Sequence, residues 1–382
     1  MKSIVFLGNF GFFERDFNRF HIKKLAKRYK VFFLDFTKIF NKNFFQREKK
    51  KFFYSKELVL IDSKKKFTKF LNEKKIECIF DLTNSKELDI FRNIINQKKI
   101  KLIEYQISLV PNFKRNFFLK IKYFFLVVLL NKALIVFYFK RLINSLTTKP
   151  LKKINFYYNY VFCVGHKGEK KSKAKLIFSH SSDYDESQKN RKKNKISKKY
   201  LVFIDQYLPF HNGYVIRGIP PFVTPEDYYN SVNRFLNLLK TKLKYNIIIA
   251  LHPRSNYKKD YFKNKKTIDY KKTGEYISKS SGIISYTSTT MCYAVMYKKP
   301  IIFYTTKEIN SSHDAYHVNF LSQVLGSKLI NIDKKNIDSK LTNKNLFRID
   351  HFKYKKFFND YICHIKSDQR ANYKKIIDVV EN

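Results

Sequence analysis

Hydrophobic and polar positions alternate along the chain in short blocks of two different periods. Runs rich in β-branched and aromatic residues predict strands, and between them apolar residues such as Phe17, Phe20 and Leu25 recur at helical spacing. This alternation is typical of a parallel sheet with crossover helices. Strands are expected at residues 5–7, 30–36, 58–61, 78–82, 101–105, 160–164 and 175–178. The first half is therefore predicted to be Rossmann-like.

A polar, lysine-rich stretch at residues 187–199 interrupts the pattern and predicts a linker. It divides the chain into predicted domains at 1–186 and 200–382. The alternation then restarts, with strands expected at 200–205, 246–251, 281–286 and 300–304. Thr224-Pro225 predicts the start of a long helix, because threonine is a good N-cap and proline suits the first helical position. The predicted fold class is α/β, with two Rossmann-like domains facing across a cleft.

Composition adds a strong positive charge to this picture. The 382 residues carry a formal net charge of +47, which favours an anionic partner such as phosphate, lipid headgroups or nucleic acid. The lysines occur along the whole chain beside abundant Asn, Ile and Phe, and an AT-rich coding sequence produces the same mixture. The sequence contains no recognisable nucleic-acid-binding module, so nucleic acid is not the expected partner.

Cellular location is predicted from the cysteines and the N-terminus. The four cysteines stand far apart without a C-x-x-C pair, which predicts neither a zinc site nor a disulfide framework and fits a reducing cytosol. The apolar run at residues 4–7 is too short for a signal peptide and is read as the first strand. We therefore expect a cytoplasmic protein.

The segment at residues 117–139 is the most apolar part of the chain. Lysines interrupt it at positions 120, 122 and 132, which leaves too short a run for a spanning helix. A helix with this apolar bulk and basic flanks suits the surface of an anionic membrane, and burial between domains is the alternative. A peripheral position on the inner face of the cytoplasmic membrane is expected.

Candidate chemistry begins where the strand at 246–251 ends, in His252-Pro253-Arg254. In open α/β sheets, ligands bind outside the carboxyl ends of strands, and proline ends the strand there. His252 and Arg254 can donate to a phosphate ester, and His252 can give a proton or hydrogen bond to a leaving phosphate. The alternative is a histidine that only caps neighbouring backbone.

A second candidate group follows the strand predicted at 281–286. Ser288-Thr289-Thr290 precedes a predicted helix at 289–297. Hydroxyls at a helix N-terminus, beside free backbone N–H groups, form an anion site, although the same residues are also good N-caps. Two such groups on adjacent strand ends predict a phosphate site more specifically than either alone.

Together, His252-Pro253 and Ser288-Thr289-Thr290, with Lys299-Pro300 after the helix, resemble the HP and Ser/Thr motifs of bacterial sialyltransferases. They also resemble the related Kdo, polysialic-acid and CDP-glycerol (teichoic-acid) transferases, which share the GT-B fold. The resemblance covers residues 200–310. It implies a CMP-activated or other cytidine-activated donor, inverting transfer to a surface polysaccharide or lipid-linked glycan, and no obligatory metal or cofactor.

Those families also use a carboxylate base, often in an acidic-acidic-Gly motif that this sequence lacks. The best substitute is Asp205, at the end of the strand predicted at 200–205, with its carboxylate expected to face the cleft. Glu14 and Asp16 are the alternatives.

Competing motifs are weaker. The Gly8-x-x-Gly11 spacing is not a dinucleotide fingerprint, and the metal-binding type of motif at Asp183-x-Asp185 lies next to the linker rather than within the sheet. A nucleotide-sugar epimerase of the same fold and a basic nucleic-acid-binding protein are the alternative functions.

Overall fold

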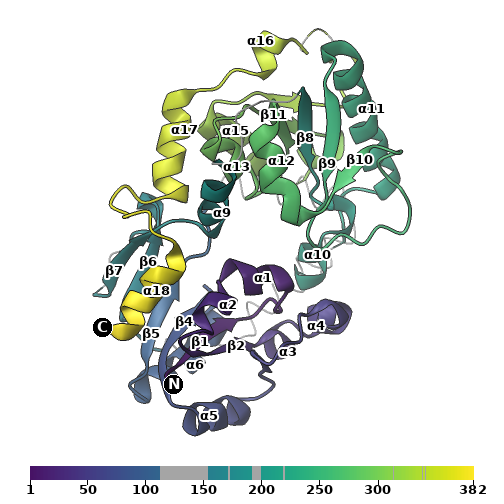
Figure 1. The fold of residues 1–382 in the computed structure, drawn as a ribbon. Coiled ribbons are helices and arrows are strands. Elements are labelled where there is room, and N and C mark those ends of the chain that lie inside the picture. Colours follow the sequence, from purple (N-terminus) through teal and green to yellow (C-terminus); the bar gives the residue numbers. More distant parts are fainter. Residues whose placement is uncertain are drawn as a thin grey trace. The chain divides into compact units, whose positions relative to one another are not determined.

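The computed structural model describes residues 1–111, 154–170, 173–191, 199–217, 220–312, 314–337, 339 and 341–382. They form two compact units. Of the described residues, unit 1 contains 1–109, 154–185 and 359–382, and unit 2 contains 110–111 and those within 186–358. Each unit is built on its own parallel sheet, as predicted (Figure 1).

Unit 1 has a seven-stranded sheet in the order β3-β2-β1-β4-β5-β6-β7, and every neighbouring pair is parallel. All seven strands predicted in this half are confirmed, with ends that differ by at most two residues. The strands are β1 (Ser3–Gly8), β2 (Lys30–Asp35), β3 (Leu58–Leu60), β4 (Ile76–Asp81), β5 (Lys101–Tyr105), β6 (Tyr160–Val164) and β7 (Lys175–Ser179).

Helices cover both faces of this sheet. One face packs against α1 (Glu14–Arg19), α2 (Ile22–Leu25) and α18 (Asn372–Glu381), and the other packs against α5 (Lys64–Glu73) and α6 (Asp89–Gln97). The remaining helices are α3 (Thr37–Phe40), α4 (Lys42–Glu48), η1 (Lys49–Lys51), η2 (Lys86–Leu88) and η3 (His166–Gly168), with α9 (Ser182–Arg191) after β7.

Aromatic rings fill the core on the α18 side. Phe6 of β1 is fully buried, and its ring stacks on Phe20 and Phe80 at centroid distances of 5.3 and 5.2 Å. Burying a phenylalanine side chain contributes about 1.5–3 kcal/mol relative to leaving it exposed. The high phenylalanine content is thus used in the core, which explains why so basic a chain still folds around two sheets.

Unit 2 has a six-stranded parallel sheet in the order β10-β9-β8-β11-β12-β13. The four strands predicted in this half are confirmed as β8 (Tyr200–Ile204), β9 (Asn246–Ala250), β11 (Gly282–Ser285) and β12 (Ile301–Thr305). The structure adds two edge strands of three residues each, β10 (Lys266–Ile268) and β13 (Leu329–Asn331). Such short edge strands carry too few apolar positions to show a period.

The helices of unit 2 begin with η4 (Leu208–Phe210) and α10 (Asn212–Arg217). The predicted long helix is α11 (Pro225–Leu243), and its Thr224 side chain accepts from the backbone N–H of Asp227 as an N-cap. After it come η5 (Tyr270–Lys272), α12 (Thr273–Lys279), α13 (Met291–Met296), α14 (Lys307–Asn310), α15 (Ala315–Leu325), α16 (Asn343–Leu346) and α17 (His351–Phe357). The next element, η7 (Phe358–Ile362), begins at the last residue of unit 2 and continues into unit 1.

The division into units differs from the predicted domains in two places. The predicted linker at 187–199 starts inside α9, so residues 187–191 are helical, and residues 192–198 lie outside the described part. Residues 359–382 belong to unit 1 rather than to the second domain. The reason is that Ile376, Val379 and Val380 of α18 are buried with Phe6 and Phe80 in one core cluster.

The apolar segment predicted as a helix at 117–139 lies outside the described residues. Among the residues that are described, no helix is both long and apolar enough to span a bilayer.

Candidate functional site

The order of strands in unit 2 marks where a ligand site belongs. The chain enters the sheet at β8, adds β9 and β10 on one side, and then returns through α12 to place β11 on the other side. The connections after β8 and β11 therefore leave in opposite directions. Parallel sheets bind ligands in the crevice that this reversal creates beyond the carboxyl ends of the strands.

His252 follows β9 at this edge of the sheet, and its backbone holds it in a defined tautomer. Nδ1 of the ring accepts from the backbone N–H of Arg254 at 3.2 Å, and the hydroxyl of Ser255 donates to the His252 carbonyl at 2.8 Å. Because Nδ1 is an acceptor here, Nε2 carries the proton of the neutral ring and is the donor. His252 and Arg254 are half-buried and Pro253 is exposed, so the turn remains open to solvent.

Asp205 follows β8, and its side chain holds the turn at His252 through a hydrogen bond. Its side chain is 1% exposed and accepts from three donors: the backbone N–H of Tyr207 at 2.8 Å, the backbone N–H of His252 at 3.3 Å and the hydroxyl of Tyr257 at 2.7 Å. Burial raises the pKa of Asp205 to about 6, and the three hydrogen bonds partly offset that rise.

This environment argues against the predicted role of Asp205 as the general base. A base must come within hydrogen-bond reach of the acceptor hydroxyl, and this carboxylate is enclosed by donors from its own unit. In this structure its carboxylate holds the backbone of His252 and the phenol of Tyr257 in place.

Aromatic residues that the sequence did not single out surround the imidazole of His252. The Tyr207 ring is nearly parallel to it at a centroid distance of 6.3 Å, and the His211 ring approaches edge-on at 5.7 Å. Tyr257 donates to Asp205 and also shares a 2.7 Å hydrogen bond with the hydroxyl of Tyr229. In the sequence, the one indication of this aromatic group is the high density of aromatic residues between positions 207 and 262.

The Ser288-Thr289-Thr290 loop follows β11 on the other side of β8. Thr289 is exposed and the other two residues are half-buried, so their hydroxyls can reach a ligand. The backbone is less available than predicted: the N–H of Thr290 donates to Oγ of Ser288, and the N–H of Met291 donates to the Ser288 carbonyl. Helix α13 is also only six residues long, so the hydroxyls rather than free N–H groups would contact an anion.

The two predicted phosphate-binding motifs, at His252 and at Ser288, lie at the same edge of the sheet but do not follow adjacent strands. Strand β8, which carries Asp205, lies between β9 and β11. Neighbouring strands are about 4.8 Å apart, so the His252 and Ser288 connections start roughly 10 Å from each other. The prediction of adjacency was wrong because the chain crosses over β8 before it forms β11. Convergence of His252 and Ser288 on one phosphate stays a prediction.

The other predicted carboxylates lie in unit 1. Asp16 is buried and accepts from the backbone N–H of Phe13 at 3.2 Å, as part of the cap of α1, whereas Glu14 is exposed. Asp183 and Asp185 of α9 have basic side chains as partners: Arg19 lies 3.6 Å from Asp183, and Nε2 of His21 lies 3.0 Å from Asp185. Their oxygens thus already serve as partners within the unit.

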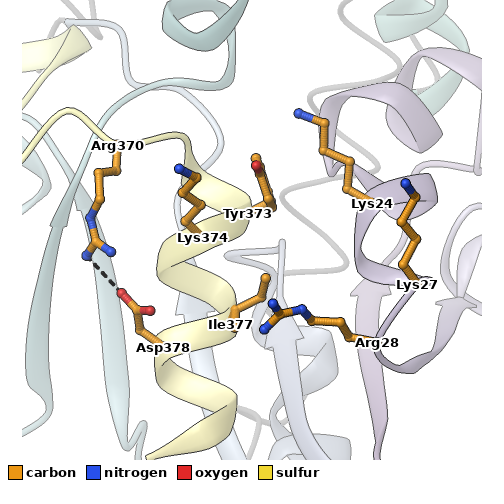
Figure 2. Close-up of a pocket in the computed structure, with 8 residues that line it drawn as sticks. All are labelled: Lys24, Lys27, Arg28, Arg370, Tyr373, Lys374, Ile377 and Asp378. Carbon is orange, nitrogen blue, oxygen red and sulfur yellow. Dashed lines mark hydrogen bonds and ion pairs between the residues drawn. The ribbon is translucent and has the colours of Figure 1, made fainter.

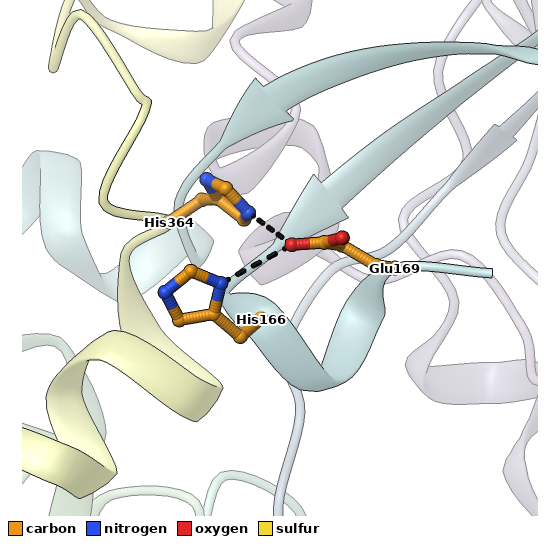
Figure 3. Close-up of side chains that lie close together, drawn as sticks. All are labelled: His166, Glu169 and His364. Carbon is orange, nitrogen blue, oxygen red and sulfur yellow. Dashed lines mark hydrogen bonds and ion pairs between the residues drawn. The ribbon is translucent and has the colours of Figure 1, made fainter.

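Another cluster in unit 1 combines His166, Glu169 and His364, whose candidate ligand atoms lie within 4.8 Å of one another (Figure 3). Oε1 of Glu169 is 2.7 Å from Nε2 of His364 and 3.1 Å from Nδ1 of His166, and these hydrogen bonds lower the pKa of Glu169. Nδ1 of His364 accepts from the backbone N–H of Lys366 at 3.0 Å, so Nε2 carries the proton.

That tautomer does not suit a metal ion. A histidine that binds a metal ion through Nε2 normally donates a hydrogen bond from Nδ1. In His364, Nδ1 instead accepts the backbone N–H of Lys366, so Nε2 keeps its proton and has no free lone pair for a metal ion. The cluster is therefore better described as a carboxylate bridging two imidazoles, which ties the segment after η7 to the loop after β6.

Comparisons with known proteins rest on structure alone. No protein-family model matches the sequence, and no curated protein sequence matches it. The structure is similar to UDP-GlcNAc 2-epimerase from Neisseria meningitidis bound to UDP-GlcNAc, with a TM-score of 0.51 and 14% identity over 100% of both chains.

Two further solved structures are similar over the whole of this chain. MurG from Acinetobacter baumannii has a TM-score of 0.50 and 9% identity, with 99% of its own chain covered. The wall teichoic acid polymerase TagF has a TM-score of 0.50 and 12% identity, with 88% of its own chain covered. At such identities the similarity establishes the fold, and the protein has two Rossmann-like units of the GT-B type.

Proposed function

We propose that the protein is a glycosyltransferase that transfers a sugar from a nucleotide-activated donor bound by unit 2. The observation that carries the proposal is the pairing of an imidazole donor, Nε2 of His252, with the Ser288 hydroxyl loop on either side of the strand reversal at β8. Solved structures of similar fold include MurG, TagF and a UDP-GlcNAc 2-epimerase, which supports a nucleotide-sugar donor.

In this mechanism the residues of unit 2 stabilise the departing phosphate. Nε2 of His252 donates to the phosphate oxygen that gains charge as the glycosidic bond breaks, and Arg254 adds a positive charge. The hydroxyls of Ser288, Thr289 and Thr290 donate to the remaining phosphate oxygens. Pro253 fixes the turn, and Asp205 acts as a positioning residue through the backbone of His252.

The general base is assigned to unit 1, where we propose that the acceptor glycan binds. Strands β1 and β4 of that unit form the equivalent reversal, because β1 pairs with β2 on one side and with β4 on the other. Glu14 lies beyond the end of β1 and is exposed, whereas Asp16 is buried in the cap of α1. Glu14→Gln should lower kcat at least 100-fold with little change in KM for the donor. An unchanged kcat would remove Glu14 from this role.

The finer parts of the proposal follow the resemblance of the two motifs to sialyltransferases and related enzymes. The donor is a CMP-activated nonulosonate or Kdo-type sugar, transfer is inverting, and neither a metal ion nor a cofactor takes part. The acceptor is a surface polysaccharide or lipid-linked glycan, which places the enzyme on the cytoplasmic face of the membrane. Activity that persists in excess chelator is expected.

A thermal-shift screen with CMP, CDP, UDP and GDP tests the proposal most directly. At a 100-fold excess over Kd, a nucleotide should stabilise the protein by about 2.7 kcal/mol. Stabilisation by a cytidine nucleotide should be lost in His252→Ala and kept in His351→Ala, which removes an exposed histidine at the start of α17 in the same unit. The absence of any nucleotide effect, or equal effects in both variants, would overturn the proposal.

A nucleotide-sugar epimerase is the second candidate, because an enzyme of that class matches the complete chain at a TM-score of 0.51. It predicts a preference for UDP over cytidine nucleotides and turnover of the sugar nucleotide without an acceptor. Incubation with UDP-GlcNAc alone, followed by separation of the sugar products, distinguishes the two reactions.

A further inference from the structure

A basic pocket lies in unit 1 between α2 and α18, apart from the sites considered above. Its volume is about 490 Å³. Figure 2 shows Lys24, Lys27 and Arg28 on the α2 side and Tyr373 and Ile377 on the side of α18 that faces them. Lys374 lies in the first turn of α18, and Arg370, just before the helix, lies with Asp378 on its other side. The three lysines and two arginines bring five positive charges to one concave surface.

In the part of the chain that the structure describes, carboxylates pair with two of these five cations and leave three without an ion pair. Asp378 lines the pocket and pairs with Arg370 at 2.8 Å, and Arg370 also pairs with Asp368 at 2.6 Å. Arg28 is 3.5 Å from Glu381. Within the described ranges, Lys24, Lys27 and Lys374 form no ion pair, and all three are exposed. Like charges crowded in this way repel one another, so the pocket is suited to an anionic ligand that relieves the repulsion.

The same wall of the pocket also carries apolar surface. Tyr373 and Ile377 of α18 are half-buried between the cations. Nζ of Lys24 lies 4.3 Å from the centre of the Tyr373 ring, and the His21 ring packs against Tyr373 at 5.4 Å. Single-stranded nucleic acids bind by stacking bases on open aromatic faces, whereas the ammonium group of Lys24 lies over a face of this ring. Its phenol and the isoleucine suit the boundary between headgroups and acyl chains.

The basic surface continues past α18. A second cavity of about 280 Å³ lies between α18 and strands β6 and β7, and it shares Arg370 and Asp378 with the first. It adds the exposed lysines Lys175 and Lys366, and beside Lys366 the side chain of Ile365 is 65% exposed. Asp368 also lines this cavity, where it pairs with Arg370 and the buried Lys375. Cations on both sides of one helix, with an exposed isoleucine at their edge, fit a surface of many headgroups better than one small ligand.

The position of the pocket leaves the reactive edge of the sheet free. Helix α18 covers a face of the sheet of unit 1 and ends beside its amino edge, where Nζ of Lys2 donates to the Val380 carbonyl. The proposed acceptor site is at the carboxyl edge of the same sheet. A surface bound at α18 therefore does not occupy the place where a glycan would react.

We infer that the pocket between α2 and α18, with the adjoining cations of the second cavity, is the surface on which the protein docks to anionic phospholipid headgroups. Lipid phosphates pair with Lys24, Lys27 and Lys374, and Tyr373 and Ile377 face the acyl boundary. The inference rests on the proposed function only in the choice of a membrane-linked acceptor, and it assigns the docking to described residues rather than to segment 117–139.

Vesicle co-sedimentation of the full chain tests the inference. The protein is mixed with vesicles of phosphatidylcholine alone or with added phosphatidylglycerol, and the comparison is made with Lys24→Gln/Lys27→Gln/Lys374→Gln. Each cation near an anionic surface contributes about 1 kcal/mol, so the triple variant should bind anionic vesicles on the order of 100-fold more weakly. Binding should need phosphatidylglycerol and should weaken as salt is added.

The control variant, Lys64→Gln/Lys65→Gln/Lys75→Gln, changes the net charge equally. Its three lysines are exposed on or near α5, which covers the opposite face of the same sheet, and they form no ion pair in the described part of the chain. It should bind vesicles almost as well as the parent. Equal losses in both triple variants would show that only net charge matters and would overturn the assignment.

Two further arms separate the sources of anionic ligand. Soluble glycerol phosphate that displaces the protein from vesicles at low millimolar concentration would overturn a surface of many headgroups in favour of a single-phosphate site. If the triple variant of Lys24, Lys27 and Lys374 loses binding to a DNA oligonucleotide but still binds vesicles, the lipid assignment would be overturned in favour of nucleic acid. The cytidine thermal shift of the variant, measured in parallel, reports on the proposed function separately, since it depends on unit 2.

Discussion

Replacing Tyr257 by phenylalanine removes one of the three hydrogen bonds to the buried carboxylate of Asp205. The phenol lies 2.7 Å from Oδ2, and the aspartate is 1% exposed, so bulk water has little access to replace the lost donor. A hydrogen bond to a charged group contributes about 1.5–3 kcal/mol. We expect Tyr257→Phe to lower the free energy of unfolding by this amount at pH 8, where Asp205 is ionised.

The loss should be smaller in acid, because the protonated carboxyl does not need this donor. Burial raises the pKa of Asp205 to about 6 from an ordinary value of 3.8. The folded protein therefore binds this proton more tightly than the unfolded chain does, and the resulting stabilisation is complete below pH 3.8 and is lost as the pH rises through 6. At 1.36 kcal/mol per pKa unit, the free energy of unfolding changes by about 3 kcal/mol across this range. Removal of the Tyr257 hydroxyl raises the pKa of Asp205 in the folded protein further, so the loss of stability moves to higher pH.

Urea denaturation at pH 5 and pH 8 measures both effects. The parent is compared with Tyr257→Phe, Asp205→Asn and the double variant, and the coupling energy of the cycle isolates the phenol–carboxylate bond. Tyr261→Phe removes a hydroxyl from the same aromatic group without touching Asp205 and serves as the control. Equal destabilisation by Tyr257→Phe at both pH values would refute the reasoning and assign the loss to packing or to the bond with Tyr229.

Four further predictions concern other parts of the structure. Ser288→Ala should weaken binding of the stabilising nucleotide roughly 10- to 100-fold, the effect of one hydrogen bond to a charged phosphate, as measured by calorimetry. Thr224→Ala should cost about 1 kcal/mol in unfolding free energy, because the cap of α11 is lost. Arg92→Ala should destabilise unit 1 by about 3–5 kcal/mol in denaturant melts, since it leaves Asp81, 2.6 Å from the guanidinium, buried without its partner. Glu169→Gln should not change the response of the melting temperature to added zinc, whereas a metal bound at this cluster would make the parent respond more strongly.

The sequence was sufficient to predict the sheets because each central strand is a continuous apolar run bounded by polar residues. The end of β9 at His252-Pro253 could be read directly, since proline stops a strand and the histidine then lies at the carboxyl edge. The same reasoning placed Asp205 at the end of β8 but did not show that its carboxylate is almost completely buried. Its burial depends on Tyr257, which comes from a loop about 50 residues later that has no period to read.

The position of α18 could not be predicted for a related reason. The amphipathic pattern around Ile376 and Val380 shows that one face of the helix is buried, but not against which sheet. Likewise, the order of strands decides whether the His252 and Ser288 connections are neighbours, and strand order is not encoded in any local pattern. Local chemistry was therefore readable, whereas pairings between distant segments were not.

The return of residues 359–382 to unit 1 has a consequence for synthesis of the protein. The sheet of unit 1 is translated first, but one side of its core includes Ile376, Val379 and Val380, which emerge about 190 residues after β7. At a translation rate of about 5–20 residues per second, that side stays open for roughly ten seconds or longer. Unit 2 can complete its fold on the ribosome during this interval, so we expect the N-terminal part to rely on chaperones until α18 has emerged.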